Sequence, residues 1–202
     1  MDKLHTQKTE LFESLLPFIA QKGWHIDAIN QWAFETTHDK ALLQLHFPEG
    51  ISDLINFLNE KLNHDLINVL EQADLSQMKI PVKIKTALMK RFELMYPYKD
   101  ILSQEQQYFK NPLHLSQALK NIYKTVDTIW FAIGDKTSDF NFYTKRLTLS
   151  AIYTSSFGYW LKDESQDIIN TNMFIDRRLE SLKIIPNIKK RIKTLFSSFS
   201  FR

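Results

Sequence analysis

The chain has 202 residues, a length typical of one domain, and 44% of them are hydrophobic, so it can bury a substantial core. Only four residues are glycine and six are proline, which favours helices with short connections over a turn-rich β fold. The absence of cysteine excludes disulfides, thiol catalysis and thiolate metal sites, and the net charge of +3 is too small to indicate a polyanionic partner.

Three short helices are expected in residues 1–48. An apolar stripe predicts a first helix that ends at Gly23, a natural C-cap residue. Asp27 can cap the second helix, and Thr37 or His38 can begin the third. This order resembles the N-terminal module of TetR-type regulators, in which the second and third helices form a DNA-binding helix-turn-helix.

The charge of this module argues against DNA binding. Between Trp24 and Glu60 the only basic residue is Lys40, against six acidic residues, which leaves a net charge of −5. Neutralisation of phosphates by basic side chains supplies most non-specific affinity for DNA. We therefore interpret residues 1–48 as a degenerate helix-turn-helix module that is retained as a scaffold.

Residues 49–183 are predicted to form a helical body, separated from the first module by the break at Phe47–Gly50. Helices are expected at Ile51–Leu70, from Pro81 to Tyr96, from Lys99 to about Phe109, at Leu115–Ile133, from Ser138 or Asp139 to about Leu161, and from Ser165 onward. The sequence thus predicts an all-α bundle of about nine helices.

The helix that ends near Leu161 is apolar on more than one side, so we expect it to be buried on both sides. Ala151, Ser155 and Gly158 share one of its faces. Small side chains at these positions would let another helix approach closely, which suits a helix that contributes to the core, to a cavity or to a dimer.

The most distinctive passage of the chain runs from Val126 to Asp163. It contains V-D-T-I-W-F-A-I-G-D-K-T-S-D-F-N-F-Y-T-K-R, followed by L-T-L-S-A-I-Y and W-L-K-D. This passage resembles the pattern of the ubiquinone-biosynthesis accessory family, the ninth Coq protein and its bacterial relatives. A second matching block is Phe174–Arg178. Two departures are visible: Ile133 replaces the family's usual alanine, and Thr137-Ser138 replaces its usual Ser-Thr order.

The resemblance implies a TetR-like, all-helical homodimer that binds lipid rather than DNA. Such a protein is expected to present a prenylated quinone intermediate to a membrane-associated di-iron hydroxylase, and not to be an enzyme itself. It also implies a partner-docking surface at Asp127 and Trp130, with the adjacent Phe131. From the residues alone, Asp127 and Phe131 lie on the solvent side of their helix, whereas Trp130 falls in the apolar stripe, so its orientation stays open.

Methionine and aromatic side chains adapt to irregular apolar ligands, and several lie on helices that would enclose a cavity in this fold. An ordinary, well-filled core is an equally good interpretation of any single one of them. The candidate lipid-binding residues are Met89, Phe92, Met95, Tyr143, Leu147 and Tyr153.

Residues 184–202 form a separate, basic segment. After Pro186 its apolar residues recur at helical spacing, and from Lys183 onward it has six basic residues and no acidic one. This pattern predicts an amphipathic helix that binds an anionic membrane surface, although packing on the body or disorder would also fit it. The candidate membrane-binding residues are Ile188, Lys189, Lys190, Arg191, Ile192, Lys193, Leu195, Phe196 and Phe199.

The start of the chain, Met1–Glu10, resembles neither a signal peptide nor a transit peptide, and no apolar run is long enough to span a membrane. Together with the basic tail, this composition predicts a cytoplasmic protein that is peripheral on the inner face of the bacterial membrane.

Sequence motifs for catalysis are absent. The four glycines form no phosphate-binding loop, no G-x-S-x-G motif occurs, and no two of the six histidines have the spacing of a helical ligand pair. We therefore expect no catalytic residue, no metal and no cofactor. The alternatives are a lipid-responsive TetR-type transcriptional regulator and an enzyme that acts on the lipid directly.

Overall fold

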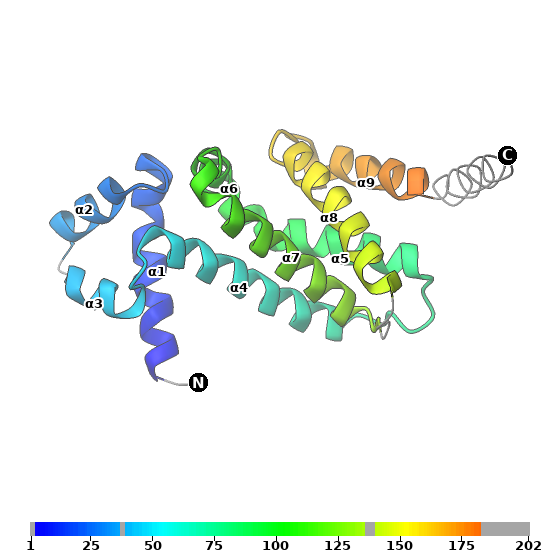
Figure 1. Cartoon of the computed structure of the whole chain (residues 1–202), viewed down its shortest axis with the longest axis horizontal. Helices are drawn as coiled ribbons and strands as arrows, with labels where there is room; N and C mark the ends of the chain where they lie inside the picture. Colours follow the sequence, from blue (N-terminus) through cyan, green and yellow to red (C-terminus); the bar gives the residue numbers. More distant parts are fainter. Residues whose placement is uncertain (1–2, 37–38, 136–139, 183–202) are drawn as a thin grey trace, which may run out of the picture.

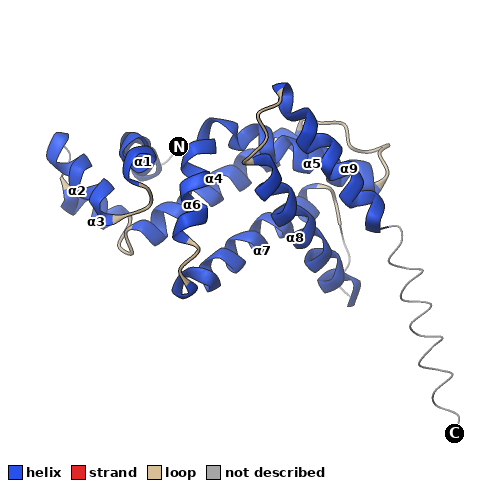
Figure 2. Ribbon diagram, turned by 90° about the horizontal axis from the view of Figure 1, so that it is seen from above, coloured by secondary structure: helices blue, strands red, loops and turns tan. Residues whose placement is uncertain are grey.

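The computed structural model describes residues 3–36, 39–135 and 140–182, and in these ranges the chain forms helices and no strand (Figures 1 and 2). The predicted all-α fold is confirmed. The α-helices are α1 (Lys3–Lys22), α2 (Ile26–Glu35), α3 (Lys40–His46), α4 (Ile51–Glu71), α5 (Ile80–Met95), α6 (Lys99–Tyr108), α7 (Leu115–Ala132), α8 (Phe140–Trp160) and α9 (Ile169–Leu182). Short 3₁₀ turns precede α6, α7 and α9.

Helices α1–α3 form one end of the molecule, and α8 and α9 lie toward the other (Figure 1). Gly23 ends α1 in a left-handed conformation (φ 75°), as expected of a glycine C-cap. The N-cap of α2 is His25 rather than the predicted Asp27, because the His25 Nδ1 accepts the Asp27 amide. Asp39 caps α3, and its carboxylate accepts the Ala41 N–H at 2.8 Å.

The N-terminal helices share their core with the body. Phe57 of α4 packs edge-to-face on Phe12 of α1, with ring centroids 5.1 Å apart, and on Phe47 at 5.5 Å. The Trp24 indole N–H donates to the Ile101 carbonyl of α6 at 2.9 Å. These contacts bury large aromatic surfaces, so the N-terminal helices are held firmly on α4 and α6.

Helices α4, α5, α7 and α8 surround the centre of the body, with α4 packed on α5 and α7, and α7 packed on α8. Phe92 of α5 stacks on two aromatic rings of α8, Tyr153 with centroids 6.1 Å apart and Trp160 at 5.5 Å. Figure 2 shows the same arrangement from above, with α7 and α8 side by side and α9 following α8.

Two helices, α7 and α8, face the solvent differently from what the positions of their apolar residues suggest. In α7 the apolar residues Leu115, Leu119 and Tyr123 are exposed, whereas the polar Asn121 and Thr125 are buried. The Thr125 hydroxyl donates to Asn59 of α4, and the backbone carbonyl of Asn121 accepts from the same side chain, so this polar side of α7 faces α4.

Helix α8 is not buried on both sides in this monomer. Tyr143, Leu147 and Ala151 are exposed on one side of it. A side chain added at Gly158 would meet no atom within 4 Å, so this part of α8 also faces open space. The described chain therefore leaves one apolar face of α8 uncovered.

Candidate functional site

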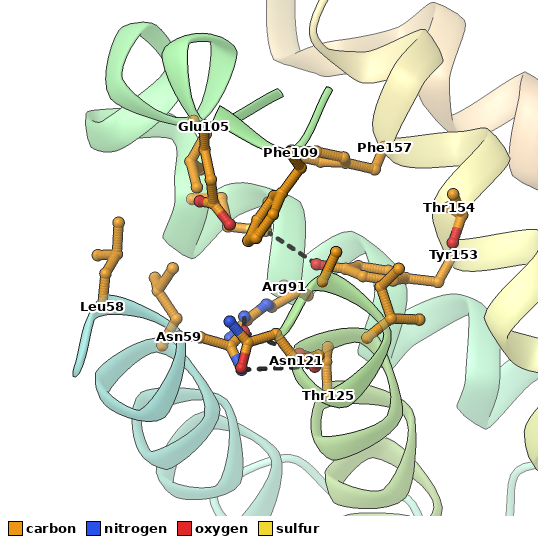
Figure 3. A pocket seen from close by; sticks show the side chains of 15 residues that line it. Leu58, Asn59, Arg91, Glu105, Phe109, Asn121, Thr125, Tyr153, Thr154 and Phe157 are labelled. Atoms are coloured by element: carbon orange, nitrogen blue, oxygen red, sulfur yellow. Dashed lines mark hydrogen bonds between the residues drawn. The ribbon is translucent and has the colours of Figure 1, made fainter. Parts of the chain in front are cut away.

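A cavity of about 100 Å³, partly open to solvent, lies between α4, α5, α6, α7 and α8 (Figure 3). Most of its wall is apolar. The lining residues are Leu58, Asn59, Leu62, Arg91, Met95, Leu102, Glu105, Phe109, Ala118, Asn121, Ile122, Thr125, Tyr153, Thr154 and Phe157. A mostly apolar lining with a few polar groups is typical of ligand sites, whereas the volume is smaller than the roughly 300–1,000 Å³ that such sites commonly have.

One end of the cavity is polar and is built by three helices. Arg91 of α5 is 1% exposed, and its Nη2 donates to Asn59 Oδ1 of α4 at 2.9 Å. The same oxygen accepts a hydrogen bond from the Thr125 hydroxyl of α7 at 3.0 Å, and Asn59 Nδ2 donates to the backbone carbonyl of Asn121 at 3.4 Å. Figure 3 shows these four side chains gathered on one side of the cavity.

Glu105 of α6 stands on another wall, with its carboxyl group toward the cavity (Figure 3). Burial raises the pKa of the Glu105 carboxyl to about 8, although the positive charge of Arg91 opposes part of this rise. At neutral pH this carboxyl is therefore mostly protonated and uncharged.

The distinctive passage of the sequence forms the junction between α7 and α8. Arg146 of α8 is buried, and its Nε donates to Asp127 of α7 at 2.7 Å. Lys145 binds Asp135 at 2.8 Å and lies 5.2 Å from the centroid of the Trp130 ring. These ion pairs and the cation–π contact join the end of α7 to the start of α8, so this part of the motif has a structural role.

The six candidate lipid-binding residues divide into three groups. Met95 and Tyr153 line the cavity, and the Tyr153 hydroxyl lies 3.9 Å from the Met95 sulfur. Phe92 is fully buried in the aromatic stack between α5 and α8, and Met89 packs against the core. Tyr143 and Leu147 are 68% and 75% exposed and do not reach the cavity, because they project from the uncovered face of α8.

The three candidate docking residues do not share one surface. Phe131 is 70% exposed and Asp127 is half-exposed, so both are accessible in the described chain. Trp130 is only 4% exposed, because the start of α8 covers this part of α7. This burial departs from the expectation that Trp130 contributes to a docking surface and agrees with its position in the apolar stripe.

The nine candidate membrane-binding residues, Ile188 to Phe199, lie outside the residues that the structure describes. In the described ranges, no helix has the length and apolar character needed to cross a bilayer. Those ranges also contain no cluster of three or more histidine, aspartate or glutamate side chains arranged to hold a metal ion.

Sequence reasoning missed the polar end of the cavity, although a signal was present. Arg91 lies three residues after Leu88 and seven after Ile84, so a charged residue interrupts the centre of the apolar face of α5. In the same way, Glu105 follows the buried Ile101 by four residues on α6. A charge in the middle of an apolar stripe indicates a buried polar group with a specific partner or ligand.

The chain is similar to COQ9 proteins. A family model described as COQ9 matches residues 115–185. The "Probable ubiquinone biosynthesis protein coq9, mitochondrial" of Dictyostelium discoideum is 29% identical over 181 residues, which are 87% of this chain and 59% of that protein. The human "Ubiquinone biosynthesis protein COQ9, mitochondrial" is 26% identical over 191 residues, 91% of this chain and 60% of that protein. The chain thus spans about three fifths of the length of these curated relatives.

A solved structure shows the same fold. The crystal structure of a TetR transcriptional regulator from Nitrosomonas europaea superposes with a TM-score of 0.64, covering 85% of this chain and 97% of that one. The sequence identity is 16%, so this likeness concerns the fold alone. The predicted TetR-like architecture is confirmed.

The predicted location is wrong. The COQ9 relatives from Dictyostelium, Drosophila and human are all named as mitochondrial, which points to a mitochondrial protein and not to one at the inner face of a bacterial membrane. The prediction rested on the composition of Met1–Glu10, on the lack of a long apolar run and on the basic tail, and none of these distinguishes a bacterial from a mitochondrial membrane.

The distinctive passage thus lies within the matched residues 115–185, the relatives align with at least 87% of the chain, and the fold is that of TetR proteins. The resemblance to the COQ9 family that the sequence predicted is therefore confirmed.

Proposed function

We propose that this protein acts in ubiquinone biosynthesis as a lipid-binding accessory protein. In this role it takes up a prenylated quinone intermediate in its helical cavity and presents it to a membrane-associated hydroxylase of the pathway. The observation that carries the proposal is the partly open, mostly apolar cavity between α4 and α8, in a chain that is similar to COQ9 proteins over most of its length. Burial of apolar surface at roughly 25 cal/mol per Å² favours transfer of a lipid into such a cavity.

The proposed division of labour follows the three parts of the chain. Residues 1–48 form a degenerate helix-turn-helix module, residues 49–183 form the body for lipid binding and dimerisation, and residues 184–202 form the basic membrane-associating tail. The protein itself performs no catalysis in this proposal, and any metal chemistry belongs to the hydroxylase.

A homodimer is part of the proposal. The uncovered face of α8 exposes Tyr143, Leu147 and Ala151, and Gly158 leaves space for a close approach of another helix. A second copy of the chain packed on this face would remove these apolar side chains from water.

The proposal is tested by mass spectrometry of lipid extracted from the purified protein. We expect a prenyl or acyl lipid to co-purify, and we expect Ala118→Phe, which places a ring in the cavity, to reduce the amount recovered. A matched control is Ala33→Phe, outside the cavity lining, which should leave the lipid content unchanged. Consistent absence of any prenyl or acyl lipid from the unmodified protein would refute lipid binding.

The tail gives a second test. Deletion of residues 187–202 removes the apolar residues and most of the basic residues of the segment, so we expect the protein to lose its binding to vesicles that contain anionic phospholipid. Flotation of vesicles with and without anionic lipid measures this loss. Replacement of the five basic residues from Lys189 onward by glutamine should weaken flotation only on the anionic vesicles, and unchanged flotation of the deletion variant would contradict the membrane role.

A TetR-type regulator that responds to a lipid is the alternative. The structural likeness to a TetR protein favours it. The net charge of −5 between Trp24 and Glu60, which includes α2 and α3, argues against it because these helices would have to approach DNA phosphates.

A further inference from the structure

The polar end of the cavity has more hydrogen-bond donors than acceptors. Arg91 Nε and Nη1 and Asn121 Nδ2 are buried and have no hydrogen-bond partner. The nearby acceptor, Asn59 Oδ1, already accepts bonds from Arg91 Nη2 and from the Thr125 hydroxyl. Buried donors without partners are rare and costly in folded proteins, so the three in this cavity take their acceptors from water or from a bound ligand.

The charge of this end is also unbalanced. Arginine stays protonated in proteins, and Arg91 has no carboxylate within salt-bridge distance among the described residues. The side chains that face it are Asn59 from α4, Glu105 from α6, Asn121 from α7 and Tyr153 from α8. Burial raises the pKa of Glu105 to about 8, so at neutral pH that carboxyl does not compensate the guanidinium charge.

We infer that the polar end of the cavity binds the anionic oxygen head group of an amphiphile, with Arg91 as its charge partner and Asn121 as a second donor. The apolar walls formed by Leu58, Met95 and Phe157 then cover the chain of the same molecule. This inference rests on the proposed lipid-binding function and adds the chemistry of the head group. Among prenylated quinone intermediates, this chemistry favours one that carries an ionised oxygen group, because a neutral quinone carbonyl would satisfy the donors but leave the buried charge of Arg91 uncompensated.

The test compares ligands that share an apolar chain and differ in the head group. Binding of dodecanoate, dodecyl phosphate and dodecanol to the delipidated full chain is measured by calorimetry at pH 7, below the concentrations at which they form micelles. Hydrogen bonds to charged groups contribute about 1.5–3 kcal/mol, so we expect at least one anionic ligand to bind about 10- to 100-fold more tightly than dodecanol. Preference for dodecanoate indicates a carboxylate, and preference for dodecyl phosphate indicates a phosphate head group.

Arg91→Met should remove this preference while binding of dodecanol stays, because methionine keeps an apolar side chain in the same wall. Lys90→Met is the matched control, since it removes one positive charge from the neighbouring position on α5, where Lys90 pairs with Glu93 outside the cavity. It should leave the preference unchanged. Asn121→Leu should reduce the preference for the anion in part. It replaces Arg91→Met as the test variant if Arg91→Met does not fold.

The pH dependence of ligand binding tests the inference on the unmodified protein, without removal of any charged side chain. Above pH 8 the Glu105 carboxyl ionises beside Arg91 and competes with the ligand, so the preference for the anion should fall between pH 7 and pH 9.5. Glu105→Gln should bind the anion equally well at both pH values.

The outcomes separate the two proposals. Equal binding of dodecanol and both anionic ligands would overturn the head-group inference and leave lipid binding intact. Binding of none of the three would count against the lipid-binding function itself. Acetate that binds as tightly as dodecanoate would also overturn the inference, because the site would then take a free anion and not an amphiphile.

Discussion

Replacement of Asp163 by alanine is expected to lower the melting temperature by about 6–12 °C, which corresponds to a loss of about 3 kcal/mol in the free energy of unfolding. Asp163 follows α8 and is 6% exposed. Its carboxylate accepts the backbone N–H and the hydroxyl of Ser165 at 3.0 and 2.6 Å, and the same two groups of Thr171 at 2.7 and 2.6 Å. One side chain thereby holds the turn between α8 and the start of α9.

The turn itself explains why the effect should be large. Asp167 and Ile168 both adopt left-handed conformations, with φ of 53° and 51°, which are unfavourable for residues other than glycine. The bonds to Asp163 offset this strain. Glu164→Ala is the matched control, because it removes an exposed carboxylate from the neighbouring position and should change the melting temperature by less than about 2 °C. If the melting temperature of Asp163→Ala equals that of the unmodified protein, the proposed role of the carboxylate is contradicted.

The hydrogen bonds to the Asp163 carboxylate also predict that the stability of the fold falls in acid. Burial alone would raise the pKa of Asp163, but the hydrogen bonds from Ser165 and Thr171 outweigh it and hold the pKa well below the ordinary value of 3.8. Because the folded pKa is lowered, the stabilisation is present above pH 3.8 and is lost as the pH falls below that value. As the pH falls from 5 to 3, the free energy of unfolding should therefore decrease less for Asp163→Asn than for the unmodified protein. Denaturant titrations at the two pH values measure this difference.

The order and approximate bounds of the helices could be predicted because helical periodicity and glycine caps are local properties of the sequence. The predicted Ile51–Leu70 and Leu115–Ile133 agree closely with α4 and α7. Which side of a helix faces inward could not be predicted in the same way, because it depends on the side chains of the helices that pack against each turn. In α7 the buried Thr125 is polar and the exposed Leu119 is apolar, since the partners of Thr125 are on α4.

The residues of the candidate site could likewise be predicted only in part. Met95 and Tyr153 were predicted and do line the cavity, because both are apolar positions on helices that meet. Tyr143 was predicted but is exposed, and nothing in the local pattern distinguishes a face that meets the cavity from one that is left uncovered. Arg91 was absent from the prediction, although its place in the apolar stripe of α5 was visible in the sequence.

Trp130 and Phe131 are neighbours in the sequence with opposite environments, and their substitutions should separate stability from partner binding. Trp130→Ala should destabilise the fold by about 3–5 kcal/mol, because it leaves a large void at the α7–α8 junction and removes the ring that faces Lys145. Phe131→Ala should change the free energy of unfolding by less than about 0.5 kcal/mol, since the side chain is 70% exposed. Denaturant unfolding of both variants measures this contrast.

The contrast reverses for the proposed contact with the hydroxylase. An exposed aromatic residue beside a charged one is a typical anchor of a protein interface, so Phe131→Ala should weaken binding to the hydroxylase by about tenfold or more without loss of stability. Trp130→Phe keeps an aromatic ring in the core and removes an indole N–H that has no hydrogen-bond partner, so it should preserve both stability and binding. If Trp130→Phe abolishes hydroxylase binding while the fold stays intact, Trp130 reaches the partner. Its buried position in the free chain would then have to open on docking.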